Sequence, residues 1–335
     1  MTGRQPAVSV GRPGLPARRG ALARHRGAAA AVAAAAALLA AGGLVDVAQA
    51  TVNGLTAGAI FALGAVGLSL VYGSLRLINF AHGDFLTFGA YAALLANAGL
   101  GLPLVAAALV ALAATALLGV GMELAMWRPM RARGAGALQL ILMAIGLAFV
   151  VRYAIAFVAG PEPRRLGVDV TSSYDLPGGL RIGQTELWVT VIAFAVLAAV
   201  VVLLRSSSLG KQMRALSDDV DLAETTGVDT GRVIIVIWAF AGVLAGLAGV
   251  LYASALGSFD PNVGFIILLS LFAAVILGGM GSAYGALLGG VTIGLVQEWS
   301  TLFIDVRWKL VVGFAVLVAV LTLRPEGFFG GERRL

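Results

Sequence analysis

The chain has 335 residues, of which 60% are hydrophobic and 12% charged, with a formal net charge of +6 and a mean hydropathy of +0.96. A soluble domain carries about 25% charged residues, so the composition excludes a water-solvated globular protein and indicates a polytopic membrane protein. The absence of cysteine excludes disulfides, thiolate zinc sites and iron–sulfur clusters.

The first 50 residues form a basic leader. Arginines before residue 27 precede the alanine-rich run 27–45, and the triplet Ala48-Gln49-Ala50 follows. A basic start, an apolar run and a small-residue triplet are typical of a secretory signal peptide, and an uncleaved extra transmembrane helix fits the same residues. Both alternatives stay open, and residues 51–330 are predicted to form the transmembrane domain in either case.

Apolar segments long enough to cross a bilayer follow the leader in close succession. The loops between them are too short to bury a core of their own, which predicts an all-α transmembrane bundle without a soluble domain. The predicted spans are 53–72, 83–99, 104–126, 138–158, 188–204, 233–252, 264–278, 284–300 and 309–323.

The distribution of arginine and lysine predicts the orientation of these spans. With loops 127–137 and 205–232 and the C-terminus in the cytoplasm, seventeen basic residues fall inside and five outside. An excess of basic residues marks cytoplasmic loops, so this topology is favoured over its inverse. It also explains the pI near 10.2 without nucleic acid as a partner. Arg152 lies within a predicted span near its outer end, and we expect its side chain to reach the interface.

Polar residues interrupt the apolar run at "LINFAHGDFLTFGAYAALLA", residues 77–96. A catalytic site, a metal site and a turn that borders a solute path are the possible interpretations. His82 and Asp84 offer two metal ligands at most, and neither an H-E-x-x-H pair nor a G-x-S-x-G elbow is present to support hydrolytic chemistry. Enzymatic function is therefore disfavoured.

A hydrogen-bonded cytoplasmic turn explains these residues better. Gly73 and Ser74 are expected to end the preceding helix, and Gly83 to lie in mid-turn, where a positive φ costs glycine little. Asn79 and His82 can bond backbone groups that lipid leaves unpaired, and Asp84 suits the first turn of the next helix. Direct contact with a solute stays open, because polar groups at membrane depth usually face a cavity.

The segment "RALSDDVDLAETTGVDTGRV", residues 214–233, predicts a short cytoplasmic helix. Ser217 is expected to be its N-cap and Gly227 its C-terminal stop. So short a helix is marginal in water and must dock, either on its own membrane domain or in the groove of a cytoplasmic partner. The candidate coupling residues are Arg214, Ser217, Val220, Ala223, Glu224 and Gly227.

Glycines recur at "LGGMGSAYGALLGG", residues 277–290. Gly281, Gly285 and Gly289 repeat every four residues, as in the packing face of a membrane helix. The glycines before them could instead break a helix at a solute site. With the earlier turn, the candidate translocation-path or turn residues are Asn79, His82, Gly83, Asp84, Gly278, Gly279 and Gly281.

The sequence does not encode an ATP-binding loop. "RSSSLGKQM", residues 205–213, has Gly210-Lys211 but lacks the first glycine and the Ser or Thr of a P-loop. If ATP drives this protein, another chain binds it. A buried carboxylate pair suited to ion coupling is also missing from the predicted spans, which argues against a secondary transporter driven by an ion gradient.

At these motifs the sequence resembles the inner-membrane permeases of branched-chain amino acid ABC importers, the LivH type. The resemblance covers about residues 50–330 and rests on three stretches: "NGLTAGAIFALGAVGLSLVYGSLRLINFAHGDF", the loop 214–233, and "AAVILGGMGSAYGALLGG". In that family an alanine and a glycine of the cytoplasmic loop, matched by Ala223 and Gly227, engage the ATPase subunit. Glu224 is a further candidate for pairing with a basic residue of that partner.

The resemblance implies about eight core helices in the bacterial plasma membrane, with no cofactor in this chain. ATP and Mg are then expected on two partner ATPase subunits, alongside a second, LivM-like permease subunit and an extracytoplasmic solute-binding protein. The implied solute is leucine, isoleucine or valine. Urea or short amides are the alternative, because similar permeases carry them, and the pairing of identical or different permeases stays open.

Overall fold

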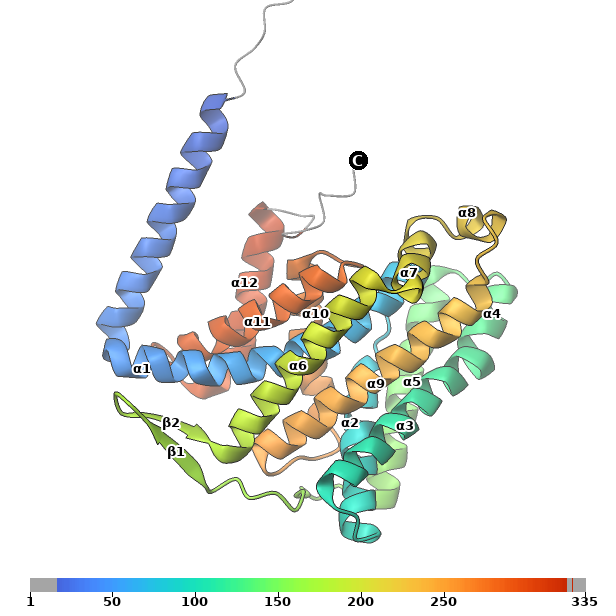
Figure 1. The fold of residues 1–335 in the computed structure, drawn as a ribbon, viewed down its shortest axis with the longest axis horizontal. Helices are drawn as coiled ribbons and strands as arrows, with labels where there is room; N and C mark the ends of the chain where they lie inside the picture. Colours follow the sequence, from blue (N-terminus) through green and yellow to red (C-terminus); the bar gives the residue numbers. More distant parts are fainter. Residues whose placement is uncertain (1–16, 324–326, 328–335) are drawn as a thin grey trace, which may run out of the picture.

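The structure, a computed structural model, describes residues 17–323 and Gly327, and for residues 17–42 and Leu323 it describes the backbone only. As predicted, the chain folds into a bundle of long helices, to which a small hairpin is added (Figure 1). Its elements are α1 (Ala17–Leu75), α2 (His82–Leu94), η1 (Leu95–Gly99), α3 (Leu104–Met122), η2 (Glu123–Trp127), α4 (Arg128–Ala132), α5 (Ala137–Ala159), β1 (Ser173–Leu176), β2 (Leu180–Gly183), α6 (Gln184–Ser206), α7 (Ser208–Asp218), α8 (Val220–Thr225), α9 (Thr230–Leu256), α10 (Val263–Gly278), α11 (Ala283–Ser300), η3 (Val306–Trp308) and α12 (Lys309–Leu323).

Helix α1 consists of two parts that meet at Gly43, whose φ of 71° and ψ of 176° are not helical. The part before Gly43 points away from the bundle, and the part after it runs through the bundle (Figure 1). The prediction that Gly73 and Ser74 end this helix is wrong. The helix continues to Leu75, and Arg76 ends it in the left-handed region with a φ of 53°.

The two interpretations of residues 1–50 predict different N-termini for the mature protein. If residues 1–50 are a signal peptide, N-terminal sequencing of the protein purified from membranes should start at Thr51. If the segment is an extra helix, sequencing should start at the original N-terminus, and that end should be protected from proteases added outside the cell. An intact leader that external protease removes would contradict both versions and the predicted topology.

Small residues bring the central helices into close contact. An added Cβ at Gly58 would lie 2.9 Å from the Cα of Val291 on α11, and one at Gly242 would lie 2.4 Å from the carbonyl oxygen of Thr115 on α3. Helices in lipid associate through such close backbone approach, because the hydrophobic effect does not drive them together. Helices α1, α9, α10 and α11 therefore form the buried centre of the bundle.

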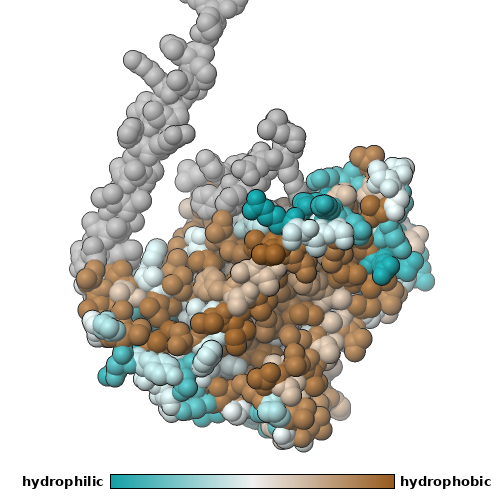
Figure 2. Space-filling model, in the orientation of Figure 1, coloured by the Kyte–Doolittle hydropathy of each residue, from teal (hydrophilic) through white to brown (hydrophobic). Residues whose placement is uncertain are grey.

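The outer helices present their apolar faces to the bilayer. Among the described residues, five helical segments are long and apolar enough to cross a membrane: Gly43–Leu75, Leu104–Ala132, Ala137–Ala159, Gln184–Ser206 and Thr230–Leu256. Hydrophobic residues cover the middle of the surface over α6, α9 and α3, and polar residues gather at its two ends (Figure 2). The protein is thus a multi-pass membrane protein.

The two polar ends differ in structure. One carries the antiparallel hairpin β1–β2, in which Ser173 pairs with Gly183, and the loop before it. In that loop Ser172 and Thr171 donate hydrogen bonds to Asp169, which hold the pKa of its carboxyl well below the usual range. Helices α7 and α8 lie at the opposite end (Figure 1).

Candidate functional site

The polar turn after α1 lies deep inside the bundle. A Cβ at Gly83 would lie 2.2 Å from the carbonyl oxygen of Gly264, in the first turn of α10. The other end of α10, at Gly278, is about 20 Å away at 1.5 Å per residue, and it lies at the α7 end. The prediction of a turn at the cytoplasmic surface is therefore wrong for residues 79–84, whereas Gly73 lies beside Ser217 of α7 and Gly281. Residues 76–81 form a non-helical segment that leads back along α1, so that His82 at the start of α2 lies beside Gly64 and Gly67.

This non-helical segment leaves backbone groups unpaired. The N–H groups of Leu77, Ile78, Asn79 and Phe80 have no hydrogen-bond acceptor among the described residues, and Leu77 and Asn79 are 3% and 0% exposed. The side-chain Nδ2 of Asn79 is also buried without a partner in this part of the chain. Irregular backbone at membrane depth is tolerated where it is buried in protein or lines a water-filled path.

Two of the predicted residues do bond backbone groups. The side-chain Oδ1 of Asn79 accepts a hydrogen bond of 3.0 Å from the N–H of Ala81. The Nε2 of His82 lies 2.9 Å from the carbonyl oxygen of Gly64 on α1. His82 therefore connects the start of α2 to the middle of α1, where its ring also lies against Gly67.

These contacts predict the effect of replacing His82 with alanine. The variant loses a buried hydrogen bond, worth about 0.5–1.5 kcal/mol, and leaves a cavity in place of the buried ring, so it should lower the thermal stability and yield of the purified complex. The KM for solute uptake should change little, because His82 bonds the backbone of its own chain. A complex of normal stability whose KM rises strongly would show that His82 contacts solute instead. Thr87→Val, which removes the acceptor of the Gly264 N–H, is the matched control for loss of a neighbouring buried hydrogen bond.

Asp84 forms an ion pair that the sequence analysis missed. It lies in the first turn of α2, as predicted, and accepts hydrogen bonds from Nε and Nη2 of Arg152 on α5, at 2.8 and 3.1 Å. The expectation that Arg152 reaches the interface is wrong, because its side chain is 9% exposed and is covered by the ring of Phe265 at 4.6 Å. The sequence contains a signal for this pair, because an acid and a base that each lie alone in an apolar span tend to pair with one another.

The glycines of this region serve close packing rather than turn geometry. Gly83 lies within α2 and its φ is not positive, so the prediction that it lies in mid-turn is wrong. It allows the backbones of α2 and α10 to touch, and Gly249 allows the same approach between α9 and Leu86 of α2. The late glycine stretch forms the hairpin between α10 and α11. Gly279 and Gly281 turn there with φ values of 96° and 85°, and Gly278 packs against Gly285.

The segment 214–233 contains two helices instead of the one predicted. Ser217 is not an N-cap, because α7 continues through it to Asp218. The cap of α8 is Asp219, whose Oδ1 accepts a hydrogen bond of 3.0 Å from the N–H of Leu222. Met213 and Leu216 explain the difference: both are buried, so the apolar face of α7 extends the helix to Asp218.

The end of α8 follows the predicted geometry. Gly227 has a φ of 87°, and its N–H bonds the carbonyl oxygen of Glu224 at 2.9 Å, which closes the helix. Glu224 also accepts a hydrogen bond of 2.5 Å from the hydroxyl of Thr230, the first residue of α9. The end of α8 is thereby tied to the central helix α9.

The side chains of α8 divide into an inward and an outward set. Ala223 is 3% exposed and faces its own chain, whereas Val220 and Leu222 are 39% and 61% exposed. Asp221 is exposed beside them. Helix α8 therefore presents an apolar surface with acidic neighbours at the far edge of the bundle (Figure 1).

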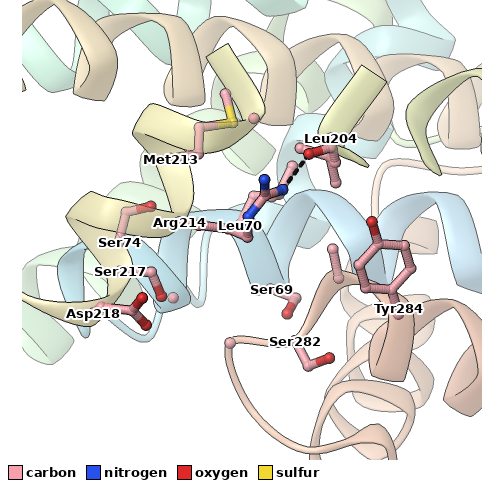
Figure 3. A pocket seen from close by; sticks show the side chains of 14 residues that line it. Ser69, Leu70, Ser74, Leu204, Met213, Arg214, Ser217, Asp218, Ser282 and Tyr284 are labelled. Carbon is pink, nitrogen blue, oxygen red and sulfur yellow. Dashed lines mark hydrogen bonds between the residues drawn. The ribbon is translucent and has the colours of Figure 1, made fainter. Parts of the chain in front are cut away.

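A pocket of ≈ 390 Å³ lies where α7 meets the ends of α1 and α11. Figure 3 shows Arg214, whose guanidinium donates a hydrogen bond to the carbonyl oxygen of Leu204, together with Ser69 and Ser282 around the same space. Within the described residues, three or more His, Asp or Glu side chains do not gather anywhere into a possible metal site.

Comparison with known proteins places this sequence among permeases. Residues 50–321 match the family model described as "Branched-chain amino acid transport system / permease component". The high-affinity branched-chain amino acid transport system permease protein LivH of Escherichia coli K12 is 31% identical over 296 residues, which cover 84% of this chain and 95% of LivH.

Two further relatives extend the comparison. BraD of Pseudomonas aeruginosa PAO1, a permease protein of the same description, is 30% identical over 294 residues, covering 84% of this chain and 95% of BraD. LivM of Escherichia coli K12 is 27% identical over 314 residues, covering 84% of this chain and 70% of LivM. No solved structure matches the chain.

Proposed function

This chain belongs to the permease component family of branched-chain amino acid transport systems, and from that premise we propose that it forms the membrane path of an ATP-driven importer for leucine, isoleucine and valine. The observation that supports a path within this chain is the buried non-helical segment 76–81. Its unpaired N–H groups and the unpartnered Nδ2 of Asn79 supply hydrogen-bond donors at membrane depth. Such donors suit a hydrated route for a polar solute.

The proposal assigns energy coupling to α8. This helix combines exposed apolar and acidic residues with a direct tie to α9 through Glu224 and Thr230. Because the sequence lacks a P-loop, ATP and Mg belong on two partner ATPase subunits, and this chain itself is non-catalytic. A short helix that stands out from a bundle fits a groove in such a subunit.

We further propose an orientation for the chain in the membrane. With α7 and α8 in the cytoplasm, the hairpin β1–β2 faces the solute-binding protein outside. The C-terminal end is then cytoplasmic. Gly327 supports this arrangement, because it lies against Ile276 and Gly279, at the end of the bundle that carries α7. The resemblance to both LivH and LivM supports a second permease subunit of the same family as the partner in the membrane.

Reconstitution of the whole complex tests the function. Vesicles that contain both permeases and the ATPase subunits, supplied with the binding protein outside and ATP inside, should accumulate radiolabelled leucine. Unlabelled isoleucine and valine should compete, and urea and acetamide should not. Accumulation that follows a proton gradient and ignores ATP would refute the proposal, as would competition by urea or acetamide alone.

A further inference from the structure

The pocket at the α7 end combines charges that complement a free amino acid. Arg214 and Asp218 both border it, four residues apart on α7, so that their side chains lie on the same face. They do not form an ion pair with each other or with any other described residue. Arg214 uses one N–H for the carbonyl of Leu204, and its remaining donors stay available.

Two further features add hydrogen-bond donors to the same pocket. Helix α11 begins there with Ser282 as its N-cap, and the N–H groups of Ala283 and Tyr284 lack acceptors within the helix by their position. Such a helix start favours a negative group. Independently, Ser69 lines the pocket, and its hydroxyl is buried and unpartnered in the described part of the chain.

The rest of the lining is apolar. Leu70, Leu204, Met213 and Ala283 provide aliphatic surface between the charged groups. The volume of ≈ 390 Å³ falls in the range of small-molecule sites. Carboxylate, ammonium and a branched aliphatic side chain therefore each find complementary surface in one pocket.

We infer that this pocket binds a free branched-chain amino acid from the cytoplasm and that the bound amino acid inhibits import. The inference rests on the proposed function for its substrate class. The carboxylate lies between Arg214, Ser69 and the start of α11, and the ammonium group lies near Asp218. A ligand held there bridges α7 to α1 and α11. Since α7 leads directly into α8, the bridge restrains the helix to which coupling is assigned.

The test uses the reconstituted complex with L-leucine sealed inside the vesicles. Initial uptake of external leucine should fall as internal leucine rises. Internal leucinamide, which lacks the carboxylate, and internal 4-methylpentanoate, which lacks the ammonium group, should not inhibit. In Ser69→Ala the concentration of internal leucine that halves uptake should rise about fivefold, the effect of one lost neutral hydrogen bond.

A matched variant and a direct binding measurement complete the test. Ser254→Ala removes a buried hydroxyl from α9 that bonds its own helix, and it should leave inhibition unchanged. Calorimetric titration of L-leucine into the complex without binding protein should show a site that Arg214→Gln weakens more than tenfold. This measurement does not depend on uptake.

Each failure has a distinct meaning. Absence of leucine uptake into vesicles that hold ATP but no leucine would refute the proposed function. The titration would still show whether the pocket binds leucine. Normal uptake with neither inhibition nor binding would refute the pocket assignment alone. The same holds if leucinamide inhibits as well as leucine, or if the effect follows the content of phosphatidylethanolamine, whose zwitterionic headgroup would then be the occupant.

Discussion

Asparagine in place of Asp84 should destabilise the permease by about 3 kcal/mol, because it leaves the buried guanidinium of Arg152 without its countercharge. The amide oxygen of the new asparagine still accepts one hydrogen bond from Arg152. The loss of stability is therefore at the low end of the range for a broken buried ion pair. Thermal unfolding of the purified complex in detergent measures the effect. We expect low yield, since α2 is the main neighbour of α5 in the bundle.

A double-mutant cycle separates the pair from simple loss of polarity. Arg152→Gln should destabilise to a similar degree, and the double variant should lose at least about 2 kcal/mol less than the sum of the two. The exposed pair of Arg181 and Asp175, with side chains 75% and 76% exposed, is the internal control. Asp175→Asn should cost less than about 1 kcal/mol. Additive losses for Asp84 and Arg152 would show that the contact does not hold α5 in place.

Valine in place of Gly227 should weaken docking of the ATPase subunits and thereby reduce ATP-driven transport. The φ of 87° costs an L residue about 1–2 kcal/mol. This cost lowers the ratio of α8 with its C-terminal turn formed to α8 with that turn open about five- to thirtyfold. The permease should still reach the membrane, because the residue is exposed and an added Cβ would meet nothing within 4 Å. ATPase subunits should co-purify poorly, and ATP-driven uptake should fall about tenfold.

Gly134→Val is the matched control for this prediction. Gly134 has a φ of 73°, its Cβ position is equally open, and it lies in the other loop predicted to be cytoplasmic. The backbone penalty is therefore similar, but α8 is untouched, and uptake should stay near normal. Full uptake and normal ATPase co-purification in Gly227→Val would leave the segment 219–228 as a plain connector.

The sequence predicts features whose causes are local. Hydropathy places most of the spans, and the left-handed stop at Gly227 follows from the preference of helix ends for glycine. The position of Asp84 in the first turn of α2 follows from the helix dipole. Each of these depends on residues within a few positions along the chain.

The features that were missed depend on tertiary contacts. Reading spans from hydropathy assumes that each helix starts at the interface, so the deep start of α2 could not be seen. The partners Asp84 and Arg152 are separated by 68 residues. The choice of Asp219 over Ser217 as the cap of α8 was decided by burial of the apolar face of α7, which competes with local capping preference.

The deep start of α2 has a consequence for how the chain is assembled during synthesis. Residues 76–81 carry unpaired N–H groups, and α2 follows with Asp84, so this stretch cannot rest in lipid as an independent span. The helices that cover it, α5, α9 and α10, leave the ribosome later. We therefore expect the first half of the permease to stay at the insertion machinery until α9 emerges, and we expect the cell to treat a chain truncated before α9 as an unfinished membrane protein.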